Sequence, residues 1–234
     1  MRRVIEPERL DELPPADPRA IGSRTDLRRL NFIMGHARIL SRAFRRHLDK
    51  TLGRSQPLRL VELGAGDGTL LLRLARRLAA LGVTAQVTLL DRQELVSAET
   101  RRAFATLNWS AESVVTDVFT WLEQPFSTVD VMLTNLFLHH FPDKPLAALL
   151  GLAAARTNLF IACEPRRSPL ALTAARWLRV IGCNSITRHD AVVSVRAGFV
   201  GHELSALWPS GAQWQSSEQP AGLFSHGFVA KRNA

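Results

Sequence analysis

Short apolar runs alternate with amphipathic stretches along most of this 234-residue chain. The apolar runs have the length of buried strands, and the stretches between them carry apolar residues at helical spacing. The predicted strands are Leu58–Leu63, Ala85–Leu90, Ser113–Thr116, Val129–Thr134 and Leu159–Cys163, and the predicted helices are 68–81, 94–107, 144–156 and about 169–181. This alternation predicts an α/β fold in which a mostly parallel sheet has helices on both faces.

The two ends of the chain are predicted to be less regular. Prolines between residues 14 and 18 indicate an arm that packs as coil or stays mobile. Thr25 or Asp26 is placed to cap a helix that ends near Lys50, and Gly53 to Gln56 would link it to the first strand. The last predicted elements are a helix near Gly201–Leu207 and strands near Gln213–Ser216 and Phe224–Ala230.

The composition favours a single soluble domain, since 46% of the residues are hydrophobic. Cys163 and Cys183 provide neither a disulfide framework nor a zinc-binding spacing. The longest apolar run, near 147–155, is too short to span a bilayer, and residues 1–20 mix Arg with Asp and Glu, unlike a signal peptide. We therefore expect a cytoplasmic protein without a transmembrane segment.

The net charge of +9 is unevenly distributed along the chain. Residues 1–59 hold 14 basic and 7 acidic groups, residues 60–162 hold 8 and 10, and residues 163–234 hold 8 and 4. The basic excess therefore lies outside the central strands. It indicates either an anionic partner, such as RNA or an acidic lipid head group, or a solvated surface rich in Arg.

A glycine-rich segment, Gly64-Ala65-Gly66-Asp67-Gly68, joins the first predicted strand to the next helix. Glycines let the backbone approach a ligand closely, and the helix N-terminus offers free N–H groups. The dinucleotide motif needs G-x-G-x-x-G spacing, which this segment lacks. Glu62 precedes the first glycine by two residues, where it could neutralise a cationic ligand such as the sulfonium and ammonium of S-adenosylmethionine.

Polar residues follow the other predicted strands, at the sheet edge where ligands of open parallel sheets bind. Asp91 closes the second strand, where a carboxylate can accept both hydroxyls of a ribose, as it also does in NAD sites. Asp117 follows the third strand, and Asn135 follows the fourth. Asp117 could instead be the N-cap of a helix that begins at Val118.

Two adjacent histidines, His139 and His140, follow the fourth strand and precede Pro142-Asp143. Adjacent side chains on an extended segment point to opposite sides, so we expect one histidine to face the site while the other caps or packs. A phenol with a pKa near 10 needs deprotonation before it attacks, and histidine is a suitable base. We hypothesise that one of the two is the general base. No metal site is predicted, because no carboxylate lies at ligand spacing.

With these motifs the chain resembles the class I S-adenosylmethionine-dependent methyltransferases. Over about residues 20–205 it is similar to bacterial enzymes that are found beside polyketide-forming enzymes and methylate phenolic hydroxyls. The resemblance implies a Rossmann-like seven-stranded sheet, with the seventh strand antiparallel between strands five and six, and S-adenosylmethionine as cofactor. The cofactor-binding residues that it implies are Glu62, Gly64, Ala65, Gly66, Asp91, Arg92, Asp117, Val118 and Asn135, with the adenine amino group near Asp117.

We expect an N-terminal arm and helical lid at residues 1–56 and a methyltransferase domain at 57–234, with a lid insertion at about 165–200. Segments of these lids are expected to contact a small-molecule acceptor. The candidate acceptor contacts are His36, Arg166, Arg188 and His189, with Arg167 as a further phenolate-stabilising group. The two histidines of this set are also reserve candidates for the base. His47, His202 and His226 are expected to be structural.

Several motifs of nucleic-acid methyltransferases are missing. The chain has no Asn/Asp-Pro-Pro-Tyr/Phe loop and no cysteine after the fourth strand, and it has only three lysines. These absences make nucleic acid an unlikely substrate without excluding it. An RNA methyltransferase that uses the basic lid, a non-catalytic cofactor-binding partner protein and an NAD-dependent oxidoreductase remain as alternatives, and the last is disfavoured by the glycine spacing. The acceptor, and oxygen or carbon as the attacking atom, stay open.

Overall fold

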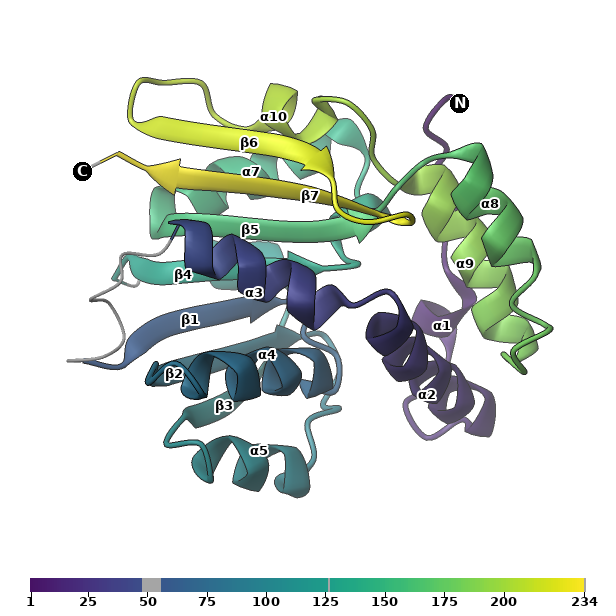
Figure 1. Ribbon diagram of the computed structural model, residues 1–234, viewed down its shortest axis with the longest axis horizontal. Coiled ribbons are helices and arrows are strands. Elements are labelled where there is room, and N and C mark those ends of the chain that lie inside the picture. Colours follow the sequence, from purple (N-terminus) through teal and green to yellow (C-terminus); the bar gives the residue numbers. More distant parts are fainter. Residues whose placement is uncertain (48–55, 126, 234) are drawn as a thin grey trace.

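The computed structural model describes residues 1–47, 56–125 and 127–233. Its centre is a seven-stranded sheet in the order β3-β2-β1-β4-β5-β7-β6 (Figure 1). β1 to β5 are parallel, and β7 is antiparallel to both of its neighbours. The strands are β1 (Leu58–Leu63), β2 (Ala85–Asp91), β3 (Ser110–Val115), β4 (Val129–Asn135), β5 (Thr157–Pro165), β6 (Trp214–Pro220) and β7 (Ser225–Arg232). The predicted Rossmann-like sheet is confirmed.

Helices cover both faces of the sheet. One face packs against α3, α4 and α5, and the other packs against α6, α7 and α10, with apolar side chains of alternating strand positions between the layers. The helices of these layers are α3 (His36–His47), α4 (Thr69–Ala79), α5 (Ala98–Ala105), α6 (Val118–Glu123), α7 (Asp143–Arg156) and α10 (Glu203–Leu207). In Figure 1 the remaining helices gather beyond the carboxyl ends of the parallel strands. They are α1 (Arg9–Glu12), α2 (Pro18–Ile33), α8 (Pro169–Arg176) and α9 (Ser185–Ala197).

The predicted single helix from about residue 25 to Lys50 is wrong, because this region forms two helices. α2 begins earlier, where the Asp17 carboxylate accepts a hydrogen bond from the Arg19 backbone N–H and Pro18 occupies the first helical position. It ends before Gly35, whose positive φ of 70° breaks the helical path. The predicted helix end and most of the predicted linker at Gly53 to Gln56 lie outside the described residues.

Strand β5 continues beyond its predicted end at Cys163 to Pro165. The extension pairs Glu164 with His226 of β7 and leaves the Glu164 side chain fully buried. Among the described helices, none combines the length and the apolar character that crossing a bilayer requires. The proposed division at residue 56, and the limits of the lid insertion, stay predictions.

Helix α3 contributes fully buried side chains to the core. Leu40 and Phe44 belong to the same apolar cluster as Leu60 of β1 and Leu71 of α4. This helix is therefore part of the layer that covers the sheet, and its packing positions the α2 segment that precedes it.

Replacing Phe44 by Ala should lower the free energy of unfolding by about 3–5 kcal/mol, because a buried ring is lost and a cavity remains. Phe32→Ala is the matched control, since the Phe32 side chain is 72% exposed and should cost less than about 1 kcal/mol. Urea denaturation measures both values. Equal losses in the two variants would show that α3 is not part of the cooperative core.

Candidate active site

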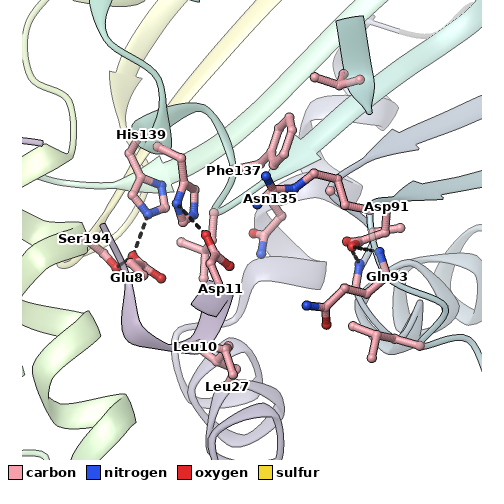
Figure 2. Close-up of a pocket in the computed structure, with 18 of the residues that line it drawn as sticks. Glu8, Leu10, Asp11, Leu27, Asp91, Gln93, Asn135, Phe137, His139 and Ser194 are labelled. Atoms are coloured by element: carbon pink, nitrogen blue, oxygen red, sulfur yellow. Dashed lines mark hydrogen bonds and ion pairs between the residues drawn. The ribbon is translucent and has the colours of Figure 1, made fainter. Parts of the chain in front are cut away.

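A cavity of about 900 Å³ lies at the carboxyl ends of the parallel strands. Residues from the glycine-rich loop, from the ends of β2 and β4 and from the N-terminal arm line it (Figure 2). Eleven of the fifteen predicted site residues are among its lining: Glu62, Gly64, Ala65, Gly66, Asp91, Arg92, Asp117, Val118, Asn135, His139 and His140. This volume is sufficient for a nucleoside-sized ligand together with part of a second molecule.

The glycine-rich loop is held in a conformation that favours glycine. Gly64, Gly66 and Gly68 have positive φ angles of 69°, 55° and 71°. A Cβ added at Gly64 would lie 2.3 Å from the Phe137 ring, so this position also needs glycine for space. The Gly66 N–H donates a hydrogen bond of 2.8 Å to Asp91, which ties the loop to the end of β2.

Glu62 is buried at the floor of the loop, and its Oε2 atom has no hydrogen-bond partner within the described residues. Burial raises the pKa of its carboxyl well above the usual value, and the nearby Asp67 and Asp91 raise it further. A positively charged ligand would relieve this repulsion. The unpartnered oxygen, in the lining of the cavity beside the glycine-rich loop, therefore fits S-adenosylmethionine, which carries two cationic groups.

Asp91 and Asp117 both use part of their carboxylates within the chain. Asp91 Oδ1 accepts a hydrogen bond of 3.0 Å from the Gln93 N–H. Asp117 is the N-cap of α6, where its Oδ1 accepts from the backbone of Phe119 at 2.9 Å and Thr120 at 3.4 Å. Asp117 therefore has the alternative role of a helix N-cap, and its contact with the adenine amino group stays a prediction.

The two histidines lie on a short 3-10 helix, η1 (Leu138–His140). Their ring centroids are 4.3 Å apart with an interplanar angle of 35°, and both side chains line the cavity. The expectation that they point to opposite sides is wrong, because it assumed an extended segment. Leu136, just before this helix, has a positive φ of 53°, an uncommon conformation for a leucine that turns the chain out of β4.

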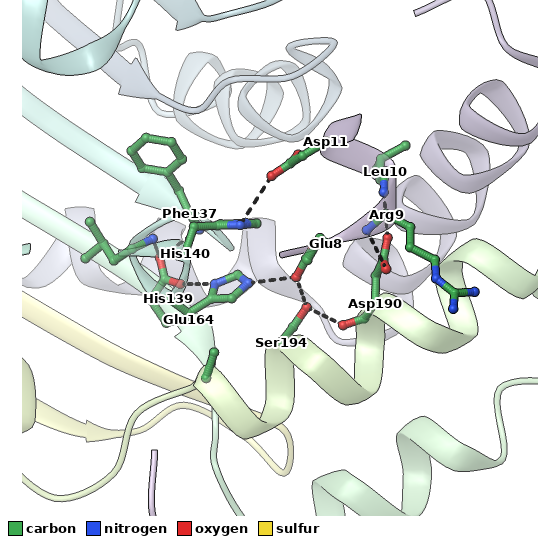
Figure 3. A network of polar contacts seen from close by, with 12 residues as sticks. Glu8, Arg9, Leu10, Asp11, Phe137, His139, His140, Glu164, Asp190 and Ser194 are labelled. Atoms are coloured by element: carbon green, nitrogen blue, oxygen red, sulfur yellow. Dashed lines mark hydrogen bonds and ion pairs between the residues drawn. The ribbon is translucent and has the colours of Figure 1, made fainter. Parts of the chain in front are cut away.

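His139 contacts carboxylates through both ring nitrogens (Figure 3). Its Nδ1 lies 2.8 Å from Oε2 of the fully buried Glu164, and its Nε2 lies 3.2 Å from Oε1 of Glu8. Burial lowers the pKa of His139, but the two carboxylates outweigh burial and raise this pKa to about 9. At neutral pH the imidazole in this arrangement is therefore protonated.

The N-terminal arm packs across the cavity instead of staying free. The backbone N–H groups of Arg9 and Leu10 donate to the two oxygens of Asp190 on α9, each at 3.0 Å. Ser194, one helical turn further along α9, donates a hydrogen bond to Glu8. Asp11 of the same arm lies 3.4 Å from Nδ1 of His140. The arm thus supplies two carboxylates to the histidine pair.

Comparison with known proteins identifies the central part of this chain. Residues 60–157 match the family described as a methyltransferase domain. The match covers the glycine-rich loop, the strand-terminal acids and the histidine pair, and it confirms the expected class of S-adenosylmethionine-dependent methyltransferase. No curated protein matches the sequence significantly.

Solved structures of methyltransferases share the fold of this domain. The plantazolicin methyltransferase BamL, in complex with a triazolic desmethyl analogue and S-adenosylhomocysteine, is 12% identical with a TM-score of 0.63, covering 96% of this chain and 93% of its own. A candidate O-methyltransferase of Nostoc punctiforme is 14% identical with a TM-score of 0.60, and the match covers 99% of this chain and 64% of that protein. The mitomycin 7-O-methyltransferase MmcR is 18% identical with a TM-score of 0.57, and the match covers 96% of this chain and 60% of that protein. The chain thus spans less than two thirds of the last two proteins.

The four predicted acceptor contacts are not among the residues that line the cavity: His36, Arg166, Arg188 and His189. His36 is fully buried, its Nε2 lies 3.0 Å from Ser225 Oγ, and burial lowers its pKa to about 4. On α9, Asp190 and Ser194 contact the arm, and Nδ1 of His189 lies 2.9 Å from Oδ1 of Asp190, the oxygen that also accepts the Arg9 N–H. The positions of the four predicted acceptor contacts therefore do not support their assignment to acceptor binding.

Arg166 and Arg167 also have structural surroundings. The backbone N–H of Arg166 donates to Phe224 O at 2.8 Å, and the Arg167 guanidinium pairs with Glu203 at 2.5 Å. Arg188 donates through Nε to Asn184 O at 3.3 Å within α9. None of these three arginines lines the cavity, so the predicted phenolate-stabilising role has no basis in the described geometry.

The histidine pair has the geometry to hold a cation. Ligand atoms of Glu8, His139 and His140 all lie within 4.8 Å of one another, a set that suits a divalent transition metal. A proton on His139 satisfies the same contact with Glu8. The sequence pattern predicted no metal site, because no carboxylate lies at ligand spacing from these histidines along the chain. In the structure the arm supplies the carboxylate of Glu8, which is 131 positions away from His139 in the sequence.

Gly64→Ala should weaken S-adenosylhomocysteine binding at least about tenfold, because the added Cβ displaces Phe137 and the loop beneath the cofactor. Gly82→Ala is the matched control: Gly82 also has a positive φ, 79°, but nothing lies within 4 Å of an added Cβ. Calorimetric titration of both variants measures the difference. Equal affinities of the two variants for S-adenosylhomocysteine would show that cofactor binding does not depend on the close packing of Phe137 against Gly64.

Proposed function

We propose that this protein transfers a methyl group from S-adenosylmethionine to a hydroxyl of a small phenolic, polyketide or quinone-like acceptor in secondary metabolism. The observation that carries this proposal is the His139 side chain, which faces the cavity and is backed by Glu164 at 2.8 Å. The plantazolicin methyltransferase and the mitomycin 7-O-methyltransferase share the fold, which supports a small acceptor by analogy. We expect the protein to act in the cytoplasm, where its two unpaired cysteines would stay reduced.

The part of the cavity near the histidines suits an apolar ring with a polar edge. Its apolar lining comes from the N-terminal arm, from α2 and from the segment after β4: Ile5, Pro7, Leu10, Leu27, Phe137 and Phe141. Glu8, Asp11, His139 and His140 form the polar end of the same space. An aromatic acceptor could bury its ring against the first set and direct a hydroxyl to the second.

In the proposed reaction, bound S-adenosylmethionine supplies the electrophilic methyl group. Glu62, Asp91 and the glycine-rich loop bind and orient it, and orientation of two reactants can contribute effective molarities on the order of 10⁵–10⁸ M. The acceptor hydroxyl takes the place of Glu8 at Nε2 of His139 and transfers its proton to that nitrogen. Glu164 holds the Nδ1–H tautomer and stabilises the imidazolium that forms, as positioned bases contribute roughly 10²–10⁴-fold.

His139→Gln should lower kcat about 10²–10⁴-fold while S-adenosylhomocysteine binds almost unchanged, because the general base is lost and the loop is intact. His140→Gln is the neighbouring control, since the His140 ring does not contact Glu164 and should retain most of kcat. Mass spectrometry of a panel of phenols and hydroxyquinones, incubated with enzyme and S-adenosylmethionine, measures turnover. No methylated product with any phenol, despite tight cofactor binding, would contradict the proposed acceptor class.

The pH dependence should report His139. Because only the neutral imidazole accepts a proton, kcat/KM at low acceptor concentration should rise with pH through about 9. Glu8→Gln removes a carboxylate that raises this pKa, so the midpoint should move to lower pH and activity near pH 7 should increase.

Glu99→Gln is the control, since Glu99 is exposed on α5 and should leave the profile unchanged. If the midpoint of the pH profile does not move in Glu8→Gln, the arm carboxylate does not raise the pKa of the group that titrates. Loss of activity on treatment with a chelator, restored by a transition metal, would instead assign the histidine pair to metal binding.

A further inference from the structure

Helix α8 and the turn that follows it expose an apolar stripe. Leu170, Trp177, Val180 and Ile181 are 56%, 66%, 73% and 42% exposed. Leu170 and Trp177 are seven residues apart, two helical turns, and therefore lie on the same face. The opposite face, with Ala171 and others, packs against α9. In Figure 1, α8 lies at the outer edge of the molecule, in agreement with the exposure of these four side chains.

The same segment is strongly cationic. Residues 165–189 contain five arginines and no Asp or Glu. Arg176 and Arg179 flank Trp177 and are exposed, and neither guanidinium group has a hydrogen-bond or ion-pair partner within the described residues. The carboxylates that border this segment are committed elsewhere, since Asp26 binds Asn184 and Thr187, and Asp190 binds the arm. The stripe therefore combines exposed apolar groups with uncompensated positive charge.

We propose that the exposed face of α8 and of the turn that follows it, defined by Leu170, Arg176, Trp177, Arg179 and Val180, docks on the surface of an anionic phospholipid bilayer. A tryptophan and aliphatic side chains enter the boundary between head groups and acyl chains, while arginines contact phosphates. Charge complementarity favours an anionic bilayer as the partner, because each basic residue near an anionic surface strengthens binding. The apolar side chains need an apolar phase, which the bilayer also provides.

Two other partners fit the stripe less well. A second copy of this chain, joined across a two-fold axis, would bring the unpaired Arg176 and Arg179 of one copy against those of the other. RNA would satisfy the arginines but would leave Val180 and Ile181 without apolar partners. The bilayer satisfies both kinds of side chain.

The docking face is one helix away from the cavity. α8 packs on α9, and α9 contributes Ser194 to the cavity lining and Asp190 to the anchor of the arm. The proposed bilayer surface would therefore lie one helix away from the end of the cavity that the arm covers. The inference itself does not depend on the acceptor, because it concerns a surface outside the site.

Vesicle flotation tests this proposal with the full-length protein. We expect it to float with vesicles that contain phosphatidylglycerol, to stay largely unbound with phosphatidylcholine alone, and to be released by salt. Arg176→Gln combined with Arg179→Gln should weaken partitioning about 30-fold. Trp177→Ser combined with Val180→Ser should weaken it at least about tenfold.

Matched controls lie on α4, where Arg76→Gln with Arg77→Gln removes two exposed arginines and Leu81→Ser, beyond its end, removes an exposed leucine. These variants should float like the wild type, and all variants should bind S-adenosylhomocysteine normally, so failure of docking is distinct from failure of the proposed function. No flotation with either vesicle, or equal loss in both arginine pairs, would overturn the proposal. Dimers that Trp177→Ser abolishes would also overturn the proposal. So would binding to RNA that is kept in Trp177→Ser with Val180→Ser but lost in Arg176→Gln with Arg179→Gln.

Discussion

The buried contact between Glu164 and His139 is the interaction on which the candidate site depends. A carboxylate without solvent must be compensated by hydrogen bonds or charge, and Glu164 receives three partners from one short segment. Its Oε2 binds His139, and its Oε1 accepts the N–H groups of Phe137 at 3.1 Å and Leu138 at 3.0 Å. One side chain at the end of β5 therefore sets the turn after β4, the orientation of the imidazole and the place of the Phe137 ring. Because that ring lies against Gly64, the same carboxylate connects the acceptor end of the cavity with the cofactor loop.

In the proposed mechanism, the arm adds a second carboxylate that works against catalysis while it is in place. With Glu8 at Nε2, the imidazole is charged and has no free lone pair for an acceptor proton. The arm is held mainly by polar contacts, among them the two backbone bonds to Asp190 and the Arg3–Asp143 pair at 2.6 Å. Each such contact contributes about 0.5–1.5 kcal/mol net, so opening the arm would cost a few kcal/mol, which ligand binding can supply.

Sequence patterns predicted the parts of this protein that depend on local spacing. The five parallel strands, the glycine-rich loop and the acids at Asp91 and Asp117 all follow from residues that are close together in the chain. The histidine pair was also found, but its orientation was not, because tertiary bonds to Glu164 decide whether residues 138–140 are extended or helical. Glu8 had no signal in the sequence, since its role depends on an arm folding back over 131 positions. His36 was misassigned because its burial depends on how α3 packs on the sheet.

Linkage between the arm and the base also bears on which molecules can react. A ligand that replaces Glu8 at Nε2 removes an anion from His139 and so lowers the pKa that kept the imidazole protonated. By reciprocity, whatever favours the neutral imidazole favours arm opening to the same extent. A ligand that binds the apolar lining but leaves Glu8 in place leaves the base charged and unable to accept a proton. In the proposed reaction, the acceptor would therefore be selected twice, first through burial of its ring and then through its hydroxyl. Only an acceptor that meets both conditions would find His139 neutral and able to accept a proton.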